Sequence, residues 1–162
     1  MTLDYEGLLA ARSRWAVVLT ELPRTTVLET ATKLAQRYTV TPNTVPQAGL
    51  TLVTLRDSVG KQAFYLGEAP LATSNVSITD SKGRTVAGGA LILADDTELA
   101  SAIAICDGVL AGRLEGWEEV AAHVSDGLEL LNRIARVRKT MLTRSRVNFA
   151  LLNEEDEDDD AR

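Results

Sequence analysis

The residues best suited to chemistry lie in a basic segment near the end of the chain, residues 133–146. This segment holds six arginine or lysine residues and no acid. They are Arg133, Arg136, Arg138, Lys139, Arg144 and Arg146. Arginine suits phosphate and carboxylate recognition because its planar guanidinium donates to two oxygens at once. The segment therefore predicts contact with an anion or with the acidic surface of a partner.

The alternative for this segment is a solvated helix face, a common role for charged residues. Two observations favour binding. Between residues 132 and 148, no acid lies three or four positions after any of these cations to neutralise it. The run also continues past the expected helix into Arg144 and Arg146. Nucleic acid is a weaker interpretation, because only Phe149 is available for base stacking and the acidic tail would repel phosphates.

Two further groups have simpler structural explanations. Gly88 and Gly89 lack the lysine and helix of a phosphate-binding loop, so a bulge or close packing is favoured. Asp95, Asp96 and Glu98 have the composition of a cation site, but a capping box at the start of a helix explains them better.

Three single residues complete the candidates. Cys106 lies in an apolar helical stripe with no histidine near it in sequence, which favours a buried thiol over a nucleophile. For His123 a helix end or a surface position is favoured over a general base. Glu68 lies between Gly67 and Pro70, which favours a turn, with a site role as the alternative.

Composition indicates one soluble domain. The 162 residues are 45% hydrophobic and carry a net charge of −6. Residues 154–162 hold seven acids and one arginine, so the rest of the chain has sixteen residues of each sign and is formally neutral. The single cysteine excludes an intrachain disulfide and indicates a reducing compartment. A signal peptide, a membrane span and a His/Cys zinc site are not expected.

Hydrophobic periodicity predicts helices at both ends of the chain. Residues 6–22 and 25–37 predict two helices, and Thr25 or Thr26 is expected to cap the second. Towards the other end, helices are expected over residues 99–110, which Gly112 ends, over residues 117–123, and from Leu128 onwards.

The middle of the chain changes to strand periodicity. Residues 39–41 precede two prolines and predict a loop or an edge strand. Further strands are expected over residues 50–55, 63–66, 76–79 and 84–93. Short turns between them imply antiparallel pairing. The fold class is therefore α+β, with N-terminal helices, a central antiparallel sheet (a meander) and C-terminal helices. One domain is expected over residues 1–153, and a disordered acidic tail over residues 154–162.

Several short pieces, spread over residues 12–153, match a known family in their order and spacing. They are Arg14-Trp15, Val18-Leu19, Gly49-Leu50, Phe-Tyr-Leu-Gly-Glu at 64–68, Thr73, Val76, Ala100, Ala104, Asp107, and Ser-Arg-Val-Asn-Phe at 145–149. In these pieces the chain resembles the G subunit (PhnG) of the bacterial carbon–phosphorus lyase system for phosphonate use. The order of the pieces is more specific than any one of them.

The resemblance implies a cytoplasmic complex in which subunits of the PhnG, PhnH, PhnI and PhnJ types are each present twice. With an ATP-binding PhnL-like protein, subunits G, H and I attach a phosphonate such as methylphosphonate to ribose C1 of ATP. Adenine leaves, giving α-D-ribose 1-methylphosphonate 5-triphosphate. This is a transferase reaction with ATP as a substrate of the complex, and no cofactor is expected on this chain alone. Subunit J later breaks the carbon–phosphorus bond with an iron–sulfur cluster and S-adenosylmethionine.

The resemblance assigns no catalytic residue to this chain, because subunit I is the expected owner of the nucleosidase chemistry. Four residues stand as candidates for contact with an anion or a partner: Arg144, Arg146, Asn148 and Glu68. No metal ligand, nucleic acid or membrane is expected. Two other classes stay open, namely a purely structural assembly subunit and a stand-alone module that binds a phosphate ligand.

One departure from the family concerns the start of the capped helix. The family often has Gly-Arg-Asp there, whereas this chain has Ala94-Asp95-Asp96. Any contact that the family's arginine makes with an anion or partner is therefore expected to be absent or altered here.

Overall fold

The computed structural model describes residues 7, 9, 11–57 and 60–144. The chain divides into two compact units, residues 1–131 and residues 132–162, and each is described by itself. The expected limits of the domain and its acidic tail stay a prediction, because residues 145–162 lie outside the described part. None of the helices in the described part is both long and apolar enough to cross a membrane.

The N-terminal helices are shorter than their periodicity predicts. Residues 7 and 9 are helical, but Ala11 leaves the helical conformation. A 3₁₀ turn η1 (Arg12–Arg14) and a short helix α2 (Trp15–Leu19) follow. Helix α3 (Arg24–Ala35) then begins directly after Pro23. The expected cap at Thr25 or Thr26 is wrong, because Pro23 occupies the N-cap position and no side chain caps the helix.

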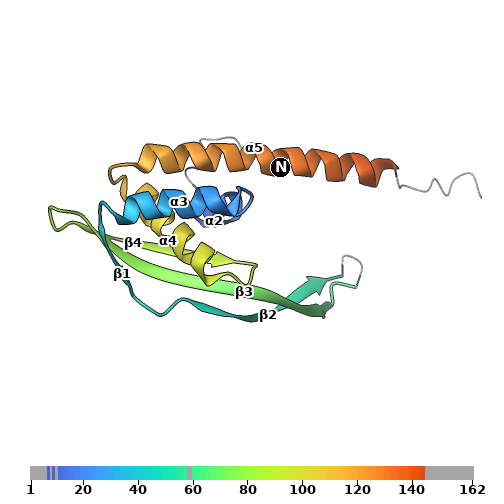
Figure 1. Ribbon diagram of the computed structural model, residues 1–162. Helices are drawn as coiled ribbons and strands as arrows, with labels where there is room; N and C mark the ends of the chain where they lie inside the picture. The colour runs from blue at the N-terminus through green and yellow to red at the C-terminus, as the bar shows by residue number, and fades with distance from the viewer. Residues whose placement is uncertain (1–6, 8, 10, 58–59, 145–162) are drawn as a thin grey trace, which may run out of the picture. The chain divides into compact units, whose positions relative to one another are not determined.

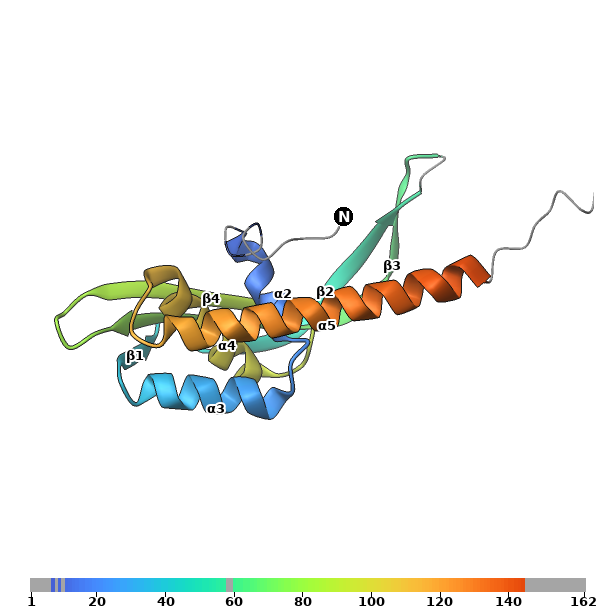
Figure 2. The ribbon, with the colours of Figure 1, turned by 90° about the horizontal axis from the view of Figure 1, so that it is seen from above.

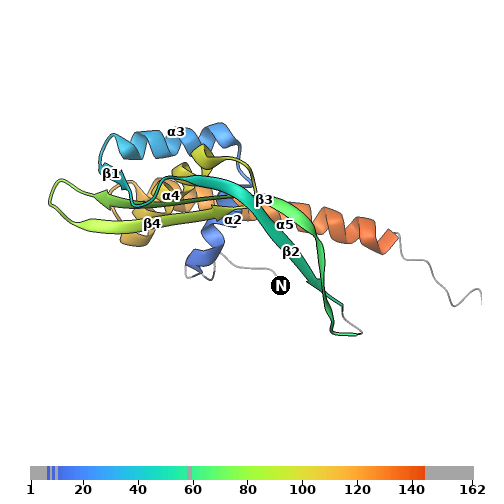
Figure 3. The ribbon, with the colours of Figure 1, turned by 90° about the horizontal axis from the view of Figure 1, so that it is seen from below.

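The sheet is antiparallel, as predicted. Its strands are β1 (Thr39–Pro42), β2 (Gln47–Arg56), β3 (Ala63–Thr79) and β4 (Thr85–Ile92). In the described part of the chain only β2, β3 and β4 form a meander, because β1 pairs with β3 and not with β2. β3 is central, because Thr73 pairs with β2 on one side and with β4 on the other. β1 and β2 follow one another along the same edge of β3 (Figure 3).

One long strand replaces the two that were expected over residues 63–66 and 76–79. β3 continues through Gly67 and Pro70 because a bulge absorbs the irregularity. Val53 pairs with Gly67 and Thr54 with Tyr65, which leaves Leu66 as the extra residue. Gly67 has a φ of 153°, which a side chain would strain. Glu68 is therefore a strand residue, and its expected turn is wrong.

Of the two C-terminal helices, the first has the cap that was predicted and the second lacks the break that was expected. α4 (Thr97–Gly112) is capped by Asp96, whose carboxylate accepts the Leu99 N–H at 2.9 Å, and Arg113 follows it in the left-handed conformation. α5 (Trp117–Arg144) is one continuous helix, so the expected break near Gly127 is wrong. A side chain at Gly127 would lie 2.3 Å from the Val18 carbonyl oxygen, which shows that this glycine allows α5 to approach α2.

The core of the first unit lies between one face of the sheet and the helices. Alternate residues of β3 are buried, from Ala72 to Ile78, as period-2 packing requires. α4 lies against this face, and residues 117–131 of α5 cover α4 from the other side (Figures 1 and 2). α4 is buried over most of its circumference because alanine and glycine recur along it. Asp107 is the one charged residue among the buried residues of the described part.

Candidate functional site

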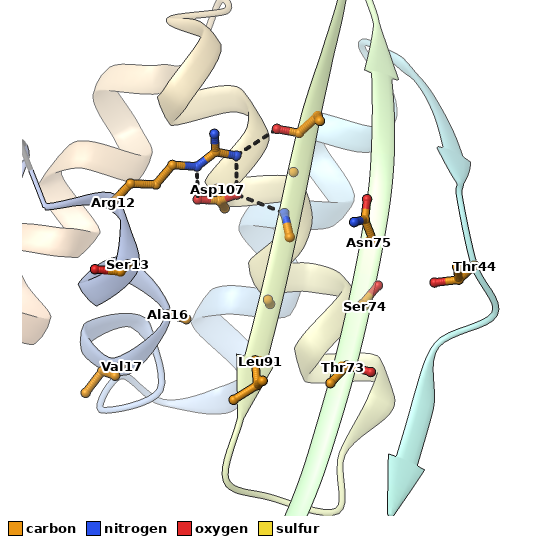
Figure 4. Close-up of a pocket in the computed structure, with 14 residues that line it drawn as sticks. Arg12, Ser13, Ala16, Val17, Thr44, Thr73, Ser74, Asn75, Leu91 and Asp107 are labelled. Atoms are coloured by element: carbon orange, nitrogen blue, oxygen red, sulfur yellow. Dashed lines mark hydrogen bonds and ion pairs between the residues drawn. The ribbon is translucent and has the colours of Figure 1, made fainter.

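A groove of about 830 Å³ lies beside the outer edge of β4. η1 and α2 form one wall, and β3 and β4 form the floor (Figure 4). Arg12 and Asp107 meet at one end, and Thr73 and Asn75 contribute polar side chains from β3. The groove is therefore a concave surface on the first unit in which an ion pair joins two distant parts of the chain.

The ion pair is bidentate. Arg12 Nε donates to Asp107 Oδ1 at 2.9 Å, and Arg12 Nη2 donates to Oδ2 at 2.7 Å. The Asp107 side chain is 7% exposed, whereas that of Arg12 is 50% exposed. The hydrogen bond with Asp107 raises the pKa of Arg12 above its ordinary value. A buried carboxylate is thus matched by a guanidinium that reaches it from solvent.

This pair occupies the edge of β4 as a neighbouring strand would. A strand's carbonyl and the amide two residues later point to the same edge. Arg12 Nη2 donates to the Ala87 carbonyl at 2.8 Å, and the Gly89 N–H donates to Asp107 Oδ2, also at 2.8 Å. The ion pair therefore supplies both the donor and the acceptor that a strand partner would offer, and it closes this part of the sheet edge.

Close packing of two glycines brings Asp107 to that edge. A Cβ on Gly88 would lie 2.0 Å from the Ala104 carbonyl oxygen and 2.9 Å from the Gly108 nitrogen. The β3–β4 register runs without a shift through this point. Of the two predicted explanations for Gly88 and Gly89, close packing is confirmed at Gly88 and a bulge is not found.

The chemistry of the groove is that of binding. Asp107 neutralises Arg12, so their pair contributes no net charge. Hydroxyl and amide groups of Ser13, Thr73 and Asn75 offer neutral hydrogen bonds along the wall and floor. Within the described residues no three His, Cys, Asp or Glu side chains gather as a metal site would require. Arg12 and Asp107, which pair with each other, are the charged side chains among the residues that line the groove.

The four candidates from the sequence are placed only in part. Glu68 is exposed in the stretch of β3 that pairs with β2. Arg144 is the last residue of α5, and Arg146 and Asn148 lie outside the described residues. Their roles stay predictions.

The basic residues that precede these candidates are exposed. Arg133, Arg136, Arg138 and Lys139 lie on α5, and none of them takes part in an ion pair within the part of the chain that the structure describes. Arg136 bonds only to the Asn132 carbonyl of its own helix, at 3.4 Å. Their charge is therefore available to an anion or a partner.

The acids at the start of α4 are explained by local structure. Asp96 caps the helix and accepts from Arg24 Nε at 2.7 Å, and Glu98 pairs with the same guanidinium. The Arg24 guanidinium, followed by the Leu99 amide, holds the pKa of Asp96 below its usual value. Glu98 thus contacts α3 instead of completing the expected capping box.

The lone histidine also has a structural partner. His123 is half-buried on α5, and its Nε2 lies 3.0 Å from the hydroxyl of buried Thr30. That hydroxyl donates to the Thr26 carbonyl at 2.9 Å, so the ring nitrogen is the donor to it. His123 lies inside α5, so the expected helix end is wrong, and its half-buried ring is only partly at the surface.

Cys106 is predicted to be chemically inert in the native protein. It is 1% exposed, and burial raises the pKa of its thiol to about 12, so the thiol stays protonated at pH 8. We expect an aromatic disulfide reagent to label it at least ~100-fold more slowly in the native chain than in the unfolded chain. Release of the coloured thiol measures both rates. Equal rates would show that Cys106 is accessible.

The Arg12–Asp107 pair was missed by sequence reasoning, although a signal for it was present. The two residues lie 95 positions apart, so no local pattern connects them. Asp107, however, interrupts an otherwise apolar stretch over residues 102–112. A buried acid requires a cation or several donors, so its position predicts a distant basic partner.

Comparison with known proteins supports the resemblance in the sequence. A family model described as "Phosphonate metabolism protein PhnG" matches residues 10–153, which is most of the chain. Among curated proteins, none matches. Both Arg12 and Asp107 lie inside the matched range, as do Arg144, Arg146 and Asn148.

Proposed function

The chain belongs to the PhnG family of phosphonate metabolism proteins, and on that premise we propose that it is an accessory subunit of a carbon–phosphorus lyase core complex. With PhnH-, PhnI-, PhnJ- and PhnL-like partners in the cytoplasm, it serves the transfer of a phosphonate onto ribose C1 of ATP with release of adenine. The observation that carries this proposal is the family match over residues 10–153.

An accessory role is supported by the chemistry of the described residues. The groove joins a neutralised ion pair to hydroxyl and amide groups. The single thiol is buried, and the single histidine bonds to a structural threonine. The complex is a transferase in this proposal, with ATP as its substrate, and the reacting groups belong to other subunits.

The basic segment is the part of the chain assigned to an anionic partner. Arg133, Arg136, Arg138 and Lys139 are exposed, and the described residues offer them no carboxylate partner. We place Arg144 and Arg146 in the same role, against a partner's acidic surface or the triphosphate of the nucleotide. Several arginines on one segment suit an extended polyphosphate, because each fork binds two oxygens.

The proposal predicts that the double variant Arg144→Ala with Arg146→Ala lowers the rate of adenine release by the assembled complex at least ~10-fold. A change of this size corresponds to the loss of about one charge-assisted hydrogen bond. The chain is co-expressed with its four partner types, the complex is weighed by native mass spectrometry, and adenine is quantified after addition of ATP and methylphosphonate. A double variant that removes the exposed charges of Arg14 and Lys82 is the matched control, and it retains activity.

The outcomes separate the possible roles. Loss of activity in a complex of unchanged mass assigns the arginines to the nucleotide, and loss of the subunit assigns them to the partner surface. Unchanged assembly together with unchanged adenine release contradicts the role of the segment. If none of the four partners co-purifies with the unaltered chain, the proposed function fails as a whole.

A further inference from the structure

The hairpin of β2 and the first part of β3 is apolar on its surface. β2 and β3 continue together beyond the ends of β1 and β4 (Figure 3). Tyr65 is 72% exposed there and Leu50 is 68% exposed. Six large apolar side chains are exposed along it: Leu50, Leu52, Leu55, Phe64, Tyr65 and Leu66. Two strands alone are marginally stable in water, so this extension indicates a surface that is covered in the functional state.

The free edge of β2 differs from the edge of β4. Arg12 and Asp107 close part of the β4 edge, whereas β2 pairs only with β3 within the part of the chain that the structure describes. From Gln47 to Leu55 the strand carries no charge and no proline, the two devices that commonly prevent strand pairing. β2 is thus open to a further antiparallel strand.

Charge and area favour a second copy of this chain as the source of that strand. Residues 47–70 carry two bases, Arg56 and Lys61, and two acids, Asp57 and Glu68, so two identical hairpins meet without net repulsion. When β2 pairs with itself in antiparallel fashion, Arg56 approaches the uncharged end at Gln47. Beside the exposed leucines, Phe64 and Tyr65 are 49% and 72% exposed, and an aromatic side chain can bury about 150–250 Å². A standard interface takes about 800 Å² from each partner.

We propose that two copies associate across a two-fold axis through their β2 edges, which joins the two sheets into one. Such an interface is isologous, so each residue of β2 faces a residue of the other β2 and the same patch serves both copies. The backbone groups of the two edges supply the hydrogen bonds, and the exposed leucines and aromatic rings pack around them.

The first test uses the full chain alone, so it does not depend on the proposed function. Sedimentation velocity between about 1 and 100 µM is expected to show a dimer. Leu52→Lys places two charges at the β2–β2 contact and raises the dissociation constant at least ~10-fold. Leu93→Lys is the matched control, because Leu93 is a similarly exposed leucine outside the hairpin, and it leaves dimerisation unchanged.

A cysteine scan locates the interface independently of that variant. Leu50→Cys, Leu52→Cys and Thr54→Cys are oxidised in turn, with buried Cys106 left in place. At least one position near the two-fold axis gives a covalent dimer, whereas Leu93→Cys gives none. The proposal is overturned if the chain is a monomer at every concentration. It is also overturned if Leu52→Lys and Leu93→Lys weaken the dimer equally, or if cysteines on β2 cross-link no faster than a cysteine at position 93.

Discussion

Gly88→Ala is expected to lower the free energy of unfolding by about 3 kcal/mol or more, whereas Gly89→Ala is expected to change it by less than about 1 kcal/mol. A methyl group on Gly88 would lie 2.0 Å from a backbone oxygen of α4, and backbone atoms cannot rotate away as a side chain can. On Gly89 the nearest atom lies at 3.9 Å, which is an ordinary contact. The two positions therefore provide a matched pair in one strand.

Urea unfolding followed by circular dichroism measures both variants against the unaltered chain. The loss of unfolding free energy for Gly108→Ala is expected to lie between the losses for the other two variants. A Cβ on Gly108 would lie 2.7 Å from the flexible end of the Ile78 side chain and 3.1 Å from Gly88 Cα. Equal losses at Gly88 and Gly89 would mean that α4 shifts without penalty and that the close contact does not hold the helix.

Removal of Arg12 is expected to destabilise the protein more than removal of its partner. Arg12→Ala leaves the Asp107 carboxylate buried with the Gly89 amide as its remaining donor, which costs about 3–5 kcal/mol. Asp107→Asn leaves a guanidinium that is half exposed and can be hydrated, and an amide oxygen that still accepts from Gly89, so we expect about 1–3 kcal/mol. Burial thus makes the two sides of one ion pair unequal.

A double-mutant cycle measures the coupling. The double variant Arg12→Ala with Asp107→Asn is expected to lose less unfolding free energy than the sum of the losses of the two single variants. The difference is at least about 1 kcal/mol, because no buried charge remains unpaired in the double variant. Arg14→Ala is the control, since Arg14 is an exposed arginine two residues away. Additive losses, or a loss at Arg14 as large as that at Arg12, would contradict this role of the pair.

The order of elements was predictable from the sequence because local periodicity and turn residues determine it. β4 and the Asp96 cap follow from strand alternation and helix-start residues within a few positions. Gly67 and Gly127 were misleading for a common reason. Each lies inside an element, Gly67 next to the bulge in β3 and Gly127 against a neighbouring helix, where a missing side chain serves tertiary structure.

The candidate site was less predictable than the fold. Its central contact joins residues 95 positions apart, and the groove exists only once α2, β3 and β4 are assembled. The basic segment was visible because charge is a property of the chain itself, and the described structure confirms that residues 133–139 expose those charges. What the charges bind is a question of partners, which a single chain does not contain.

The position of Asp107 also has a consequence for synthesis of the chain. β4 ends at Ile92, and its edge is closed only after Asp107 has been added, 18 residues beyond Gly89. At about 5–20 residues per second, the ribosome needs roughly 1–4 s for that interval. During this time Arg12 is already made but its partner Asp107 is not, so the edge of β4 stays open to a strand of another nascent chain. Slower translation between residues 89 and 107 would therefore lower the yield of folded protein.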